Sequence, residues 1–260
     1  MSVLAARSVS GLPEVHSGDD LAALIVSALA SEPRHSEPRE PSLREGHIVA
    51  IAHKVVSKAE GAVVALAGIE PSERARELAA AQGKDARAVQ VVLDQSREVL
   101  RAANGVLICR TRHGFVCANA GVDASNAAAA DSLIVLPRDP DASARGLRAR
   151  LRELTGVAPA VLITDSFGRA WRHGQCDVAI GCAGIAALDD WRGRRDSTGL
   201  ELRATWIALV DAVAAAADLA RAKDSREPVV IVEGLERFVS DADGLGAAEL
   251  LRPLEEDLFR

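Results

Sequence analysis

The sequence contains no tyrosine, and its other aromatic residues are only four phenylalanines and three tryptophans. Proteins that bind single-stranded nucleic acids stack the bases on aromatic side chains, so a platform of that kind is not expected here. The formal net charge is −6, whereas nonspecific binding to nucleic acid needs an excess of lysine and arginine. We therefore expect no nucleic-acid partner.

Cysteine is also scarce, and no two cysteines form a CxxC pair. Cys109 and Cys117 lie eight residues apart, and Cys176 and Cys182 lie six apart, spacings that match no zinc signature. Each lies among apolar or small residues, which is typical of a buried free thiol. Reduced thiols favour a cytoplasmic protein. The sequence has neither a signal-peptide pattern nor an apolar run near the ~20 residues of a membrane helix, so no membrane partner is expected.

Two common nucleotide-binding signatures are missing. The phosphate-binding loop GxxxxGK[ST] and the glycine-rich Rossmann fingerprint do not occur. The expected strands and helices alternate, but glycine-rich stretches such as residues 174–185 interrupt any simple βαβ series. This favours a mixed α+β fold. The 260 residues are enough for one large domain or two small ones.

Hydrophobic periodicity predicts the main elements. We expect helices over residues 21–30, 71–101, 142–154 and 201–223, and strands over residues 47–52, 106–109, 132–137, 160–164 and 228–232. Asp141 or Ser143 is the expected N-cap of the third helix. The alternative is that Asp139 and Asp141 point into a cleft.

Residues 113–126, HGFVCANAGVDASN, carry many short polar side chains. Gly121 allows a positive φ or a close approach of the backbone to a ligand. Asp123, Ser125 and Asn126 offer oxygen ligands and amide donors of the kind that bind a hydrated divalent cation and its phosphates. An Asx-rich turn between a strand and a helix explains the same residues, and the stretch alone does not decide between the two.

Two more stretches suit the binding of phosphate and metal. After the strand at residues 47–52, Lys54 and Lys58 lie four residues apart and can hold phosphates as point charges; the alternative is a surface strand end with snorkelling lysines. Asp165 and Ser166 follow the strand at residues 160–164, where a carboxylate and a hydroxyl are well placed for a metal.

Arginines follow this Asp–Ser pair. Arg169 and Arg172 are expected to form a cationic pocket for anionic groups, although a strand-to-loop corner with solvent-facing arginines explains them too. His53 and His113 lie within these stretches without an obvious orienting partner. Oxygen ligands together with basic residues indicate a metal-bound nucleoside triphosphate.

The chain also resembles a known family. GLPEV, HKVVSKAEG, RHGFVCANAGVDASN, LPRDPDASA, ITDSFGRAWRHGQ, AIGCAGI and EPVVIVEGL are similar, in this order from residue 11 to residue 259, to segments of the coenzyme F420-0:L-glutamate ligases. The resemblance implies a family-specific mixed α+β fold and an intertwined homodimer. It also implies a single ligase domain over residues 1–260, or two closely packed lobes, without the nitroreductase-like domain that follows in some relatives.

The resemblance further implies a reaction. These enzymes use GTP, Mg²⁺ or Mn²⁺, and K⁺ to add L-glutamate in γ-linkage to F420-0 and on to F420-1. An acyl phosphate is the expected intermediate, with GDP and phosphate as products. Two rival functions are a different metal- and NTP-dependent ligase or phosphotransferase, and a non-catalytic nucleotide-binding subunit.

The same resemblance implies roles for particular residues. The expected GTP contacts are Leu12, Pro13, Glu14, Val15, His53, Lys54, Lys58 and Asn126. The expected metal positions are Asp123, Asp165, Ser166 and Lys223. Ser166, His53 and Lys223 replace the Thr, Gln and Gln of other members, and a lysine cannot bind a cation as glutamine can. Arg138 and Glu233 stand where Glu and Arg are usual.

Overall fold

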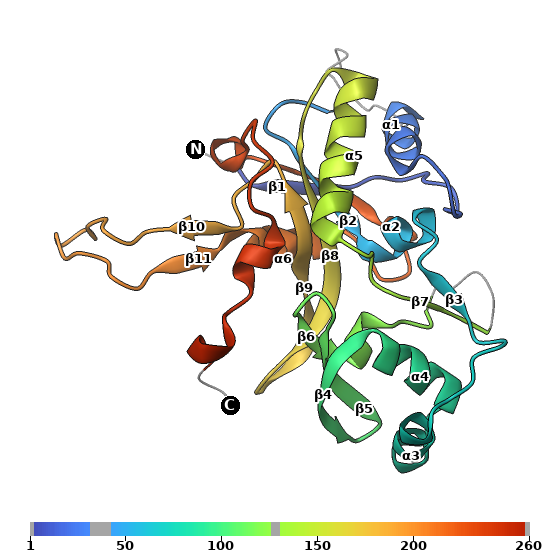
Figure 1. The fold of residues 1–260 in the computed structure, drawn as a ribbon. Coiled ribbons are helices and arrows are strands. Elements are labelled where there is room, and N and C mark those ends of the chain that lie inside the picture. The colour runs from blue at the N-terminus through green and yellow to red at the C-terminus, as the bar shows by residue number, and fades with distance from the viewer. Residues whose placement is uncertain (1–2, 32–42, 126–130, 258–260) are drawn as a thin grey trace.

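The computed structural model describes residues 3–31, 43–125 and 131–257 (Figure 1). A five-stranded mixed sheet forms its centre. In spatial order its strands are β1 (Ala5–Ser8), β12 (Val229–Glu233), β2 (Ile48–Ala52), β8 (Ala160–Arg169) and β9 (Arg172–Ala183). Only β2 and β8 run parallel; the other neighbouring strands of this sheet are antiparallel. The mixed α+β architecture expected from the sequence is confirmed.

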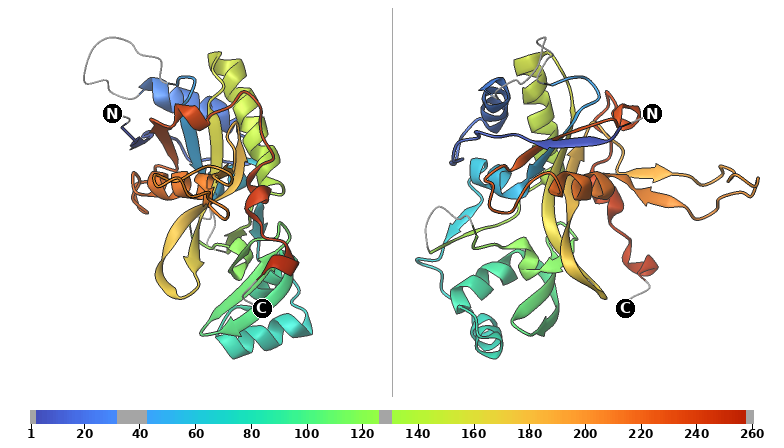
Figure 2. Two further views of the ribbon diagram at one scale, coloured as in Figure 1. Left: turned by 90° about the vertical axis from the view of Figure 1, so that its left-hand side faces the viewer. Right: turned by 180° about the vertical axis from the view of Figure 1, so that it is seen from behind.

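Both faces of this sheet are buried at its centre, where β2, β12 and the first half of β8 are apolar. Val49 and Ile51 of β2 face a core shared with α1 (Leu21–Ser31), α2 (His53–Ala59) and α5 (Pro140–Thr155). Ile48 and Ala50 face the opposite core, which α6 (Leu209–Asp218) covers. Helices therefore cover both faces, as Figure 2 shows from the side.

A second, smaller sheet lies below the central sheet in Figure 1. It consists of β4 (Ser96–Ala103), β5 (Val106–Thr111) and β6 (Val116–Ala118), packed against α3 (Glu73–Gln82) and α4 (Ala86–Asp94). The two-stranded ladder of β3 (Val63–Ala65) and β7 (Ser132–Ile134) has a cluster of its own, in which α4 takes part.

A second two-stranded sheet, β10 (Leu188–Asp190) and β11 (Trp206–Ala208), projects from the body as an arm (Figure 1). The remaining described elements are the 3₁₀ helices η1 (Asn119–Gly121), η2 (Glu236–Phe238), η3 (Ala247–Leu250) and η4 (Leu254–Glu256). Within the described ranges, no helix is long and apolar enough to cross a membrane.

Three predicted elements have different bounds in the structure. The expected helix over residues 71–101 is wrong. Helix α3 ends at Gln82 because Gly83, with a φ of 65°, caps it; Asp85 then caps α4, and β4 follows as a strand. The expected helix over residues 201–223 begins only at α6, since β11 precedes it. The strand expected over residues 132–137 ends at Ile134.

The start of α5 also differs from expectation. Its N-cap is Asp139, which accepts a hydrogen bond from the Ala142 amide at 2.9 Å, and neither Asp141 nor Ser143 has that role. Asp141 instead accepts backbone N–H bonds from Cys182 at 2.8 Å and Ala247 at 2.7 Å. Its carboxylate therefore joins α5 to β9 and η3.

Candidate functional site at the first turn of α2

The register of the parallel strands β2 and β8 brings together two of the predicted site residues. Ala52 at the end of β2 is the partner of Thr164 in β8, so the next residue of each strand lies at the same edge. Those residues are His53 and Asp165, with His53 Nε2 at 3.4 Å from Asp165 Oδ1. His53 is 2% exposed, and its Nδ1 lies 3.3 Å from Ser57 Oγ. Ser57 therefore orients the histidine, contrary to expectation, whereas its buried Nε2 makes no hydrogen bond to the described residues.

The next residue of α2 contacts the other predicted carboxylate. Lys54 Nζ lies 2.6 Å from Asp123 Oδ2 and donates to Ser125 Oγ at 2.6 Å. The Ser125 amide donates to Asp123 Oδ1 at 2.6 Å. Burial raises the pKa of Asp123, but the bonds from Lys54 and Ser125 outweigh it and leave that pKa below its usual value.

Backbone pairing holds the stretch that carries Asp123. It forms β6 and η1, and Asp123 exchanges backbone hydrogen bonds with Ile134 at 3.0 and 2.8 Å. Gly121 has the expected positive φ, 72°, and a Cβ there would lie 2.8 Å from Leu136. The glycine therefore permits close packing within the protein. Asn126 lies outside the described residues.

Lys58, one turn further along α2, connects the helix to residues 12–15. Its Nζ donates to Glu14 Oε1 at 2.5 Å, and the lysine is 8% exposed. Val15 is buried and Leu12 packs against the same core, while Pro13 and Glu14 are exposed. Glu14 thus contacts α2, the helix to which His53, Lys54 and Lys58 belong.

Ser166 belongs to a polar network that was not foreseen. Its Oγ donates to Asp177 Oδ1 at 2.5 Å and accepts from Lys223 Nζ at 2.7 Å. Asp177 is 1% exposed and also accepts from Thr164 at 3.0 Å and from Arg221. Burial raises the pKa of Asp177, yet these partners lower it overall. A lone carboxylate inside the apolar stretch at residues 176–183 was the available signal, because a buried charge needs a partner.

The two predicted arginines lie elsewhere. β8 continues beyond Thr164 to Arg169, so Asp165 and Ser166 lie within a strand and not at its end. Arg169 and Arg172 flank the exposed tip of the β8–β9 hairpin, where Trp171 has a φ of 58°. Arg169 Nη2 donates to the His173 carbonyl at 3.3 Å. The expected cationic pocket is absent at this tip.

The donor atoms at the first turn of α2 suit a divalent cation only in part. In the described ranges, no three His, Cys, Asp or Glu side chains converge as metal ligands. Asp123 and Asp165 fit the oxygen preference of Mg²⁺ and Mn²⁺, which retain waters and nucleotide oxygens as further ligands. Lys223 does not fit, since an ammonium only donates. Burial opposes its charge, but the hydrogen bond to Asp218 and the charge of Asp177 raise the pKa of Lys223.

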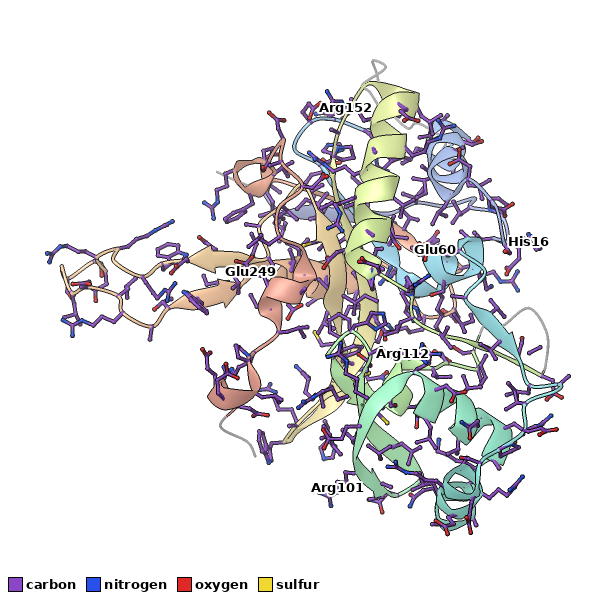
Figure 3. All side chains as sticks on the ribbon, viewed as in Figure 1. His16, Glu60, Arg101, Arg112, Arg152 and Glu249 are labelled. Atoms are coloured by element: carbon purple, nitrogen blue, oxygen red, sulfur yellow. The ribbon has the colours of Figure 1, made fainter. Side chains whose placement is uncertain are left out.

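A hollow of about 720 Å³ lies between α1, α2 and α5. Val56, Ala59 and Glu60 line it from α2, and Glu60 is labelled beside α5 in Figure 3. Arg138 and Asp139 also line it, so the cleft alternative holds for Asp139 but not for Asp141, and none of the residues expected to bind GTP or metal does. Lys54 and Lys58 lie on the opposite side of the helix, because successive residues turn by about 100°. We therefore place the candidate site at the charged residues around the first turn of α2 and not in this hollow.

Comparison with known proteins identifies the family. The F420-0:gamma-glutamyl ligase family model matches residues 11–234. The chain belongs to this family. The coenzyme F420:L-glutamate ligase of Methanopyrus kandleri is 46% identical over 249 residues, which cover 95% of this chain and 94% of that protein. The enzyme of the same name from Methanothermobacter thermautotrophicus is 44% identical, with 97% of each chain covered. That of Archaeoglobus fulgidus is 42% identical, covering 97% and 94%.

Proposed function

We propose that the protein is a ligase that adds L-glutamate in γ-linkage to coenzyme F420-0, and on to F420-1, with GTP as the energy source. The observation that carries this proposal is the arrangement at the first turn of α2. His53 contacts Asp165 and Lys54 contacts Asp123, in a chain whose relatives share 40–46% identity. Basic and acidic groups side by side suit a nucleotide whose phosphates carry a metal.

The proposed GTP site extends along α2. Lys54 and Lys58 would bind phosphate oxygens as point charges. In the structure Lys54 forms an ion pair with Asp123, and Lys58 forms one with Glu14. Those ion pairs keep the two ammonium groups in place before the nucleotide binds. Residues 12–15, His53 and Asn126 complete the proposed nucleotide contacts.

Asp123 and Asp165 would hold Mg²⁺ or Mn²⁺, which neutralises charge on the phosphates when bound. Ser166 stands next to Asp165 in β8, but its side chain points to the other face of the strand, where it joins Thr164 in the network of Asp177. We propose K⁺ as a further requirement of the reaction. Lys223 is not among the proposed ligands, because its ammonium already donates to Ser166 at 2.7 Å.

In the proposed reaction, a carboxylate oxygen of F420-0 attacks the γ-phosphorus of GTP, and GDP leaves. The amine of L-glutamate then attacks the carbonyl carbon of the acyl phosphate. An amide bond forms, phosphate leaves, and the amine loses a proton. The positive ammonium of Lys54 would stabilise the negative charge on the phosphate oxygens during the first step. Arg169 and Arg172 are given no role in these steps, because they lie at the exposed tip of the β8–β9 hairpin.

We also propose that the protein forms a homodimer through the β10–β11 arm. The arm exposes Leu200 (70%), Trp206 (50%) and Ile207 (42%). Exposed apolar residues on a projecting element are typical of a surface that another chain covers. Light scattering after size exclusion tests this: a Trp206→Glu, Ile207→Glu variant is expected to be monomeric, and an unchanged dimer would contradict the role of the arm.

Mass spectrometry of a ligation mixture tests the proposed function. Purified protein, F420-0, L-glutamate, Mn²⁺ and K⁺ are incubated with GTP, with ATP or with no nucleotide. A gain of one or more glutamyl units with GTP alone, matched by release of GDP, is expected. GDP release without a mass gain would indicate a different acceptor. Tight GTP binding with neither product would indicate a non-catalytic subunit.

A further inference from the structure

The ammonium of Lys223 occupies a position surrounded by oxygen atoms. Its Nζ lies 2.7 Å from Ser166 Oγ and 2.9 Å from Asp218 Oδ1. The third oxygen, Asp177 Oδ1, lies 3.5 Å away. These oxygens come from β8, β9 and the last residue of α6. A hydroxyl and two carboxylates are donors that hard cations prefer, and here a protonated amine holds them together.

The charges around this position balance only when the lysine is present. Arg221 pairs with the Oδ2 atom of Asp177, and Lys223 lies on the Oδ1 side of the same carboxylate. Two basic groups, Arg221 and Lys223, therefore face two carboxylates, Asp177 and Asp218. Asp177 is 1% exposed although the Lys223 side chain is 66% exposed, and a buried charge that loses a partner is costly. Removal of the ammonium leaves one negative charge in excess.

We propose that Lys223 takes the place of one bound cation, so that this chain positions Ser166 with its own side chain. Replacing the amine opens a divalent-cation site formed by Ser166, Asp177 and Asp218. The inference deepens the proposed function, because it concerns the residue next to Asp165. Lys223 is a positioning residue, since it acts through the Ser166 hydroxyl.

Counting bound Mn²⁺ on the full-length protein tests the proposal. Equilibrium dialysis, with free Mn²⁺ read by electron paramagnetic resonance, compares the wild type with Lys223→Gln. The variant is expected to bind one more Mn²⁺ per chain than the wild type. Adding Asp218→Asn to the variant is expected to abolish the extra ion. Lys223→Met, which opens the same three oxygens, serves as a second variant if the glutamine variant does not fold.

Two controls separate this effect from a change of overall charge. Lys84→Gln removes the same charge at a lysine that bonds Asn119 Oδ1 at 3.4 Å, and it is expected to keep the wild-type count. Lys223→Arg retains a positive side chain at this position and is also expected to keep the wild-type Mn²⁺ count. Equal counts and affinities in the wild type and Lys223→Gln would overturn the proposal. The count does not depend on turnover, so a protein without ligase activity would refute the proposed function and leave this inference standing.

Discussion

Lys54 Nζ lies 2.6 Å from Asp123 Oδ2, and this contact joins α2 to the polar stretch that follows β6. The lysine is the second residue of α2, and the first residue, His53, faces Asp165 at 3.4 Å. Two neighbouring residues of one helix thus meet two carboxylates from separate parts of the chain. The proposed function places the triphosphate at this meeting point.

Replacing Lys54 by methionine is expected to lower kcat/KM for GTP by about 10²–10³-fold, the usual effect of removing one charged donor from a developing anion. Steady-state ligation assays measure it. Lys84→Met removes a lysine outside the site and is expected to stay close to the wild type. Comparable losses in both variants would show that Lys54 has no special role.

Asp177 is expected to make stability depend on pH. Its pKa is lowered below the ordinary value of 3.8, so its contribution is present above that value and is lost as the pH falls through the lower, folded-state pKa. Near pH 7, Asp177→Asn removes the buried partner of Arg221, which keeps only Asp218 at 3.9 Å, and is expected to cost about 3–5 kcal/mol. Denaturant unfolding at several pH values should show the difference between variant and wild type shrinking below about pH 4. A difference that does not change with pH would contradict this role.

Asp141 is expected to matter more for stability than the helix cap Asp139. Asp141→Ala leaves the amides of Cys182, Ala247 and Ala248 without their acceptor, a loss of about 3 kcal/mol. Asp139→Ala removes only the cap, which is worth about 1 kcal/mol. Chemical denaturation of both variants ranks them, and the reverse order would refute the assignment.

The four cysteines are expected to differ in reactivity. Burial raises the pKa of Cys117 and of Cys182 to about 12 and raises that of Cys109. A thiol reacts as its thiolate, so iodoacetamide at pH 8 should label Cys176, the partly exposed one, well before the others. Peptide mapping reads the sites, and labelling in denaturant is the control. Rapid labelling of Cys117 in the native protein would contradict the burial of its side chain in β6.

The sequence predicted elements where local signals were strong. Asp20 precedes the apolar run of α1, and Asp20 Oδ1 accepts a hydrogen bond from the Ala23 amide at 3.1 Å. The continuous apolar stretches became β2, β8 and β12. The sequence does not predict β4, because residues 96–103 form a strand by pairing with β5. Pairing of this kind outweighs the intrinsic propensity of the residues.

The site was foreseen as separate motifs and not as an arrangement. Lys54 and Asp123 were each selected from local chemistry, but their contact depends on tertiary structure. The parallel register of β2 and β8, which sets His53 against Asp165, has no local signature. The apolar run predicts a strand that ends at Thr164, with Arg169 and Arg172 in a pocket beyond it; β8 instead continues to Arg169, and both arginines lie at the hairpin tip.

The most direct test of the central claim is ligation by two variants, Asp123→Ala and Asp165→Ala. Asp131→Ala is the matched control, since that side chain is 70% exposed. Mass spectrometry follows glutamyl addition to F420-0 with GTP and Mn²⁺, and circular dichroism verifies folding. The account predicts at least ~10²-fold slower ligation in both site variants and wild-type rates in the control. Wild-type ligation by a folded Asp123→Ala or Asp165→Ala protein would contradict it.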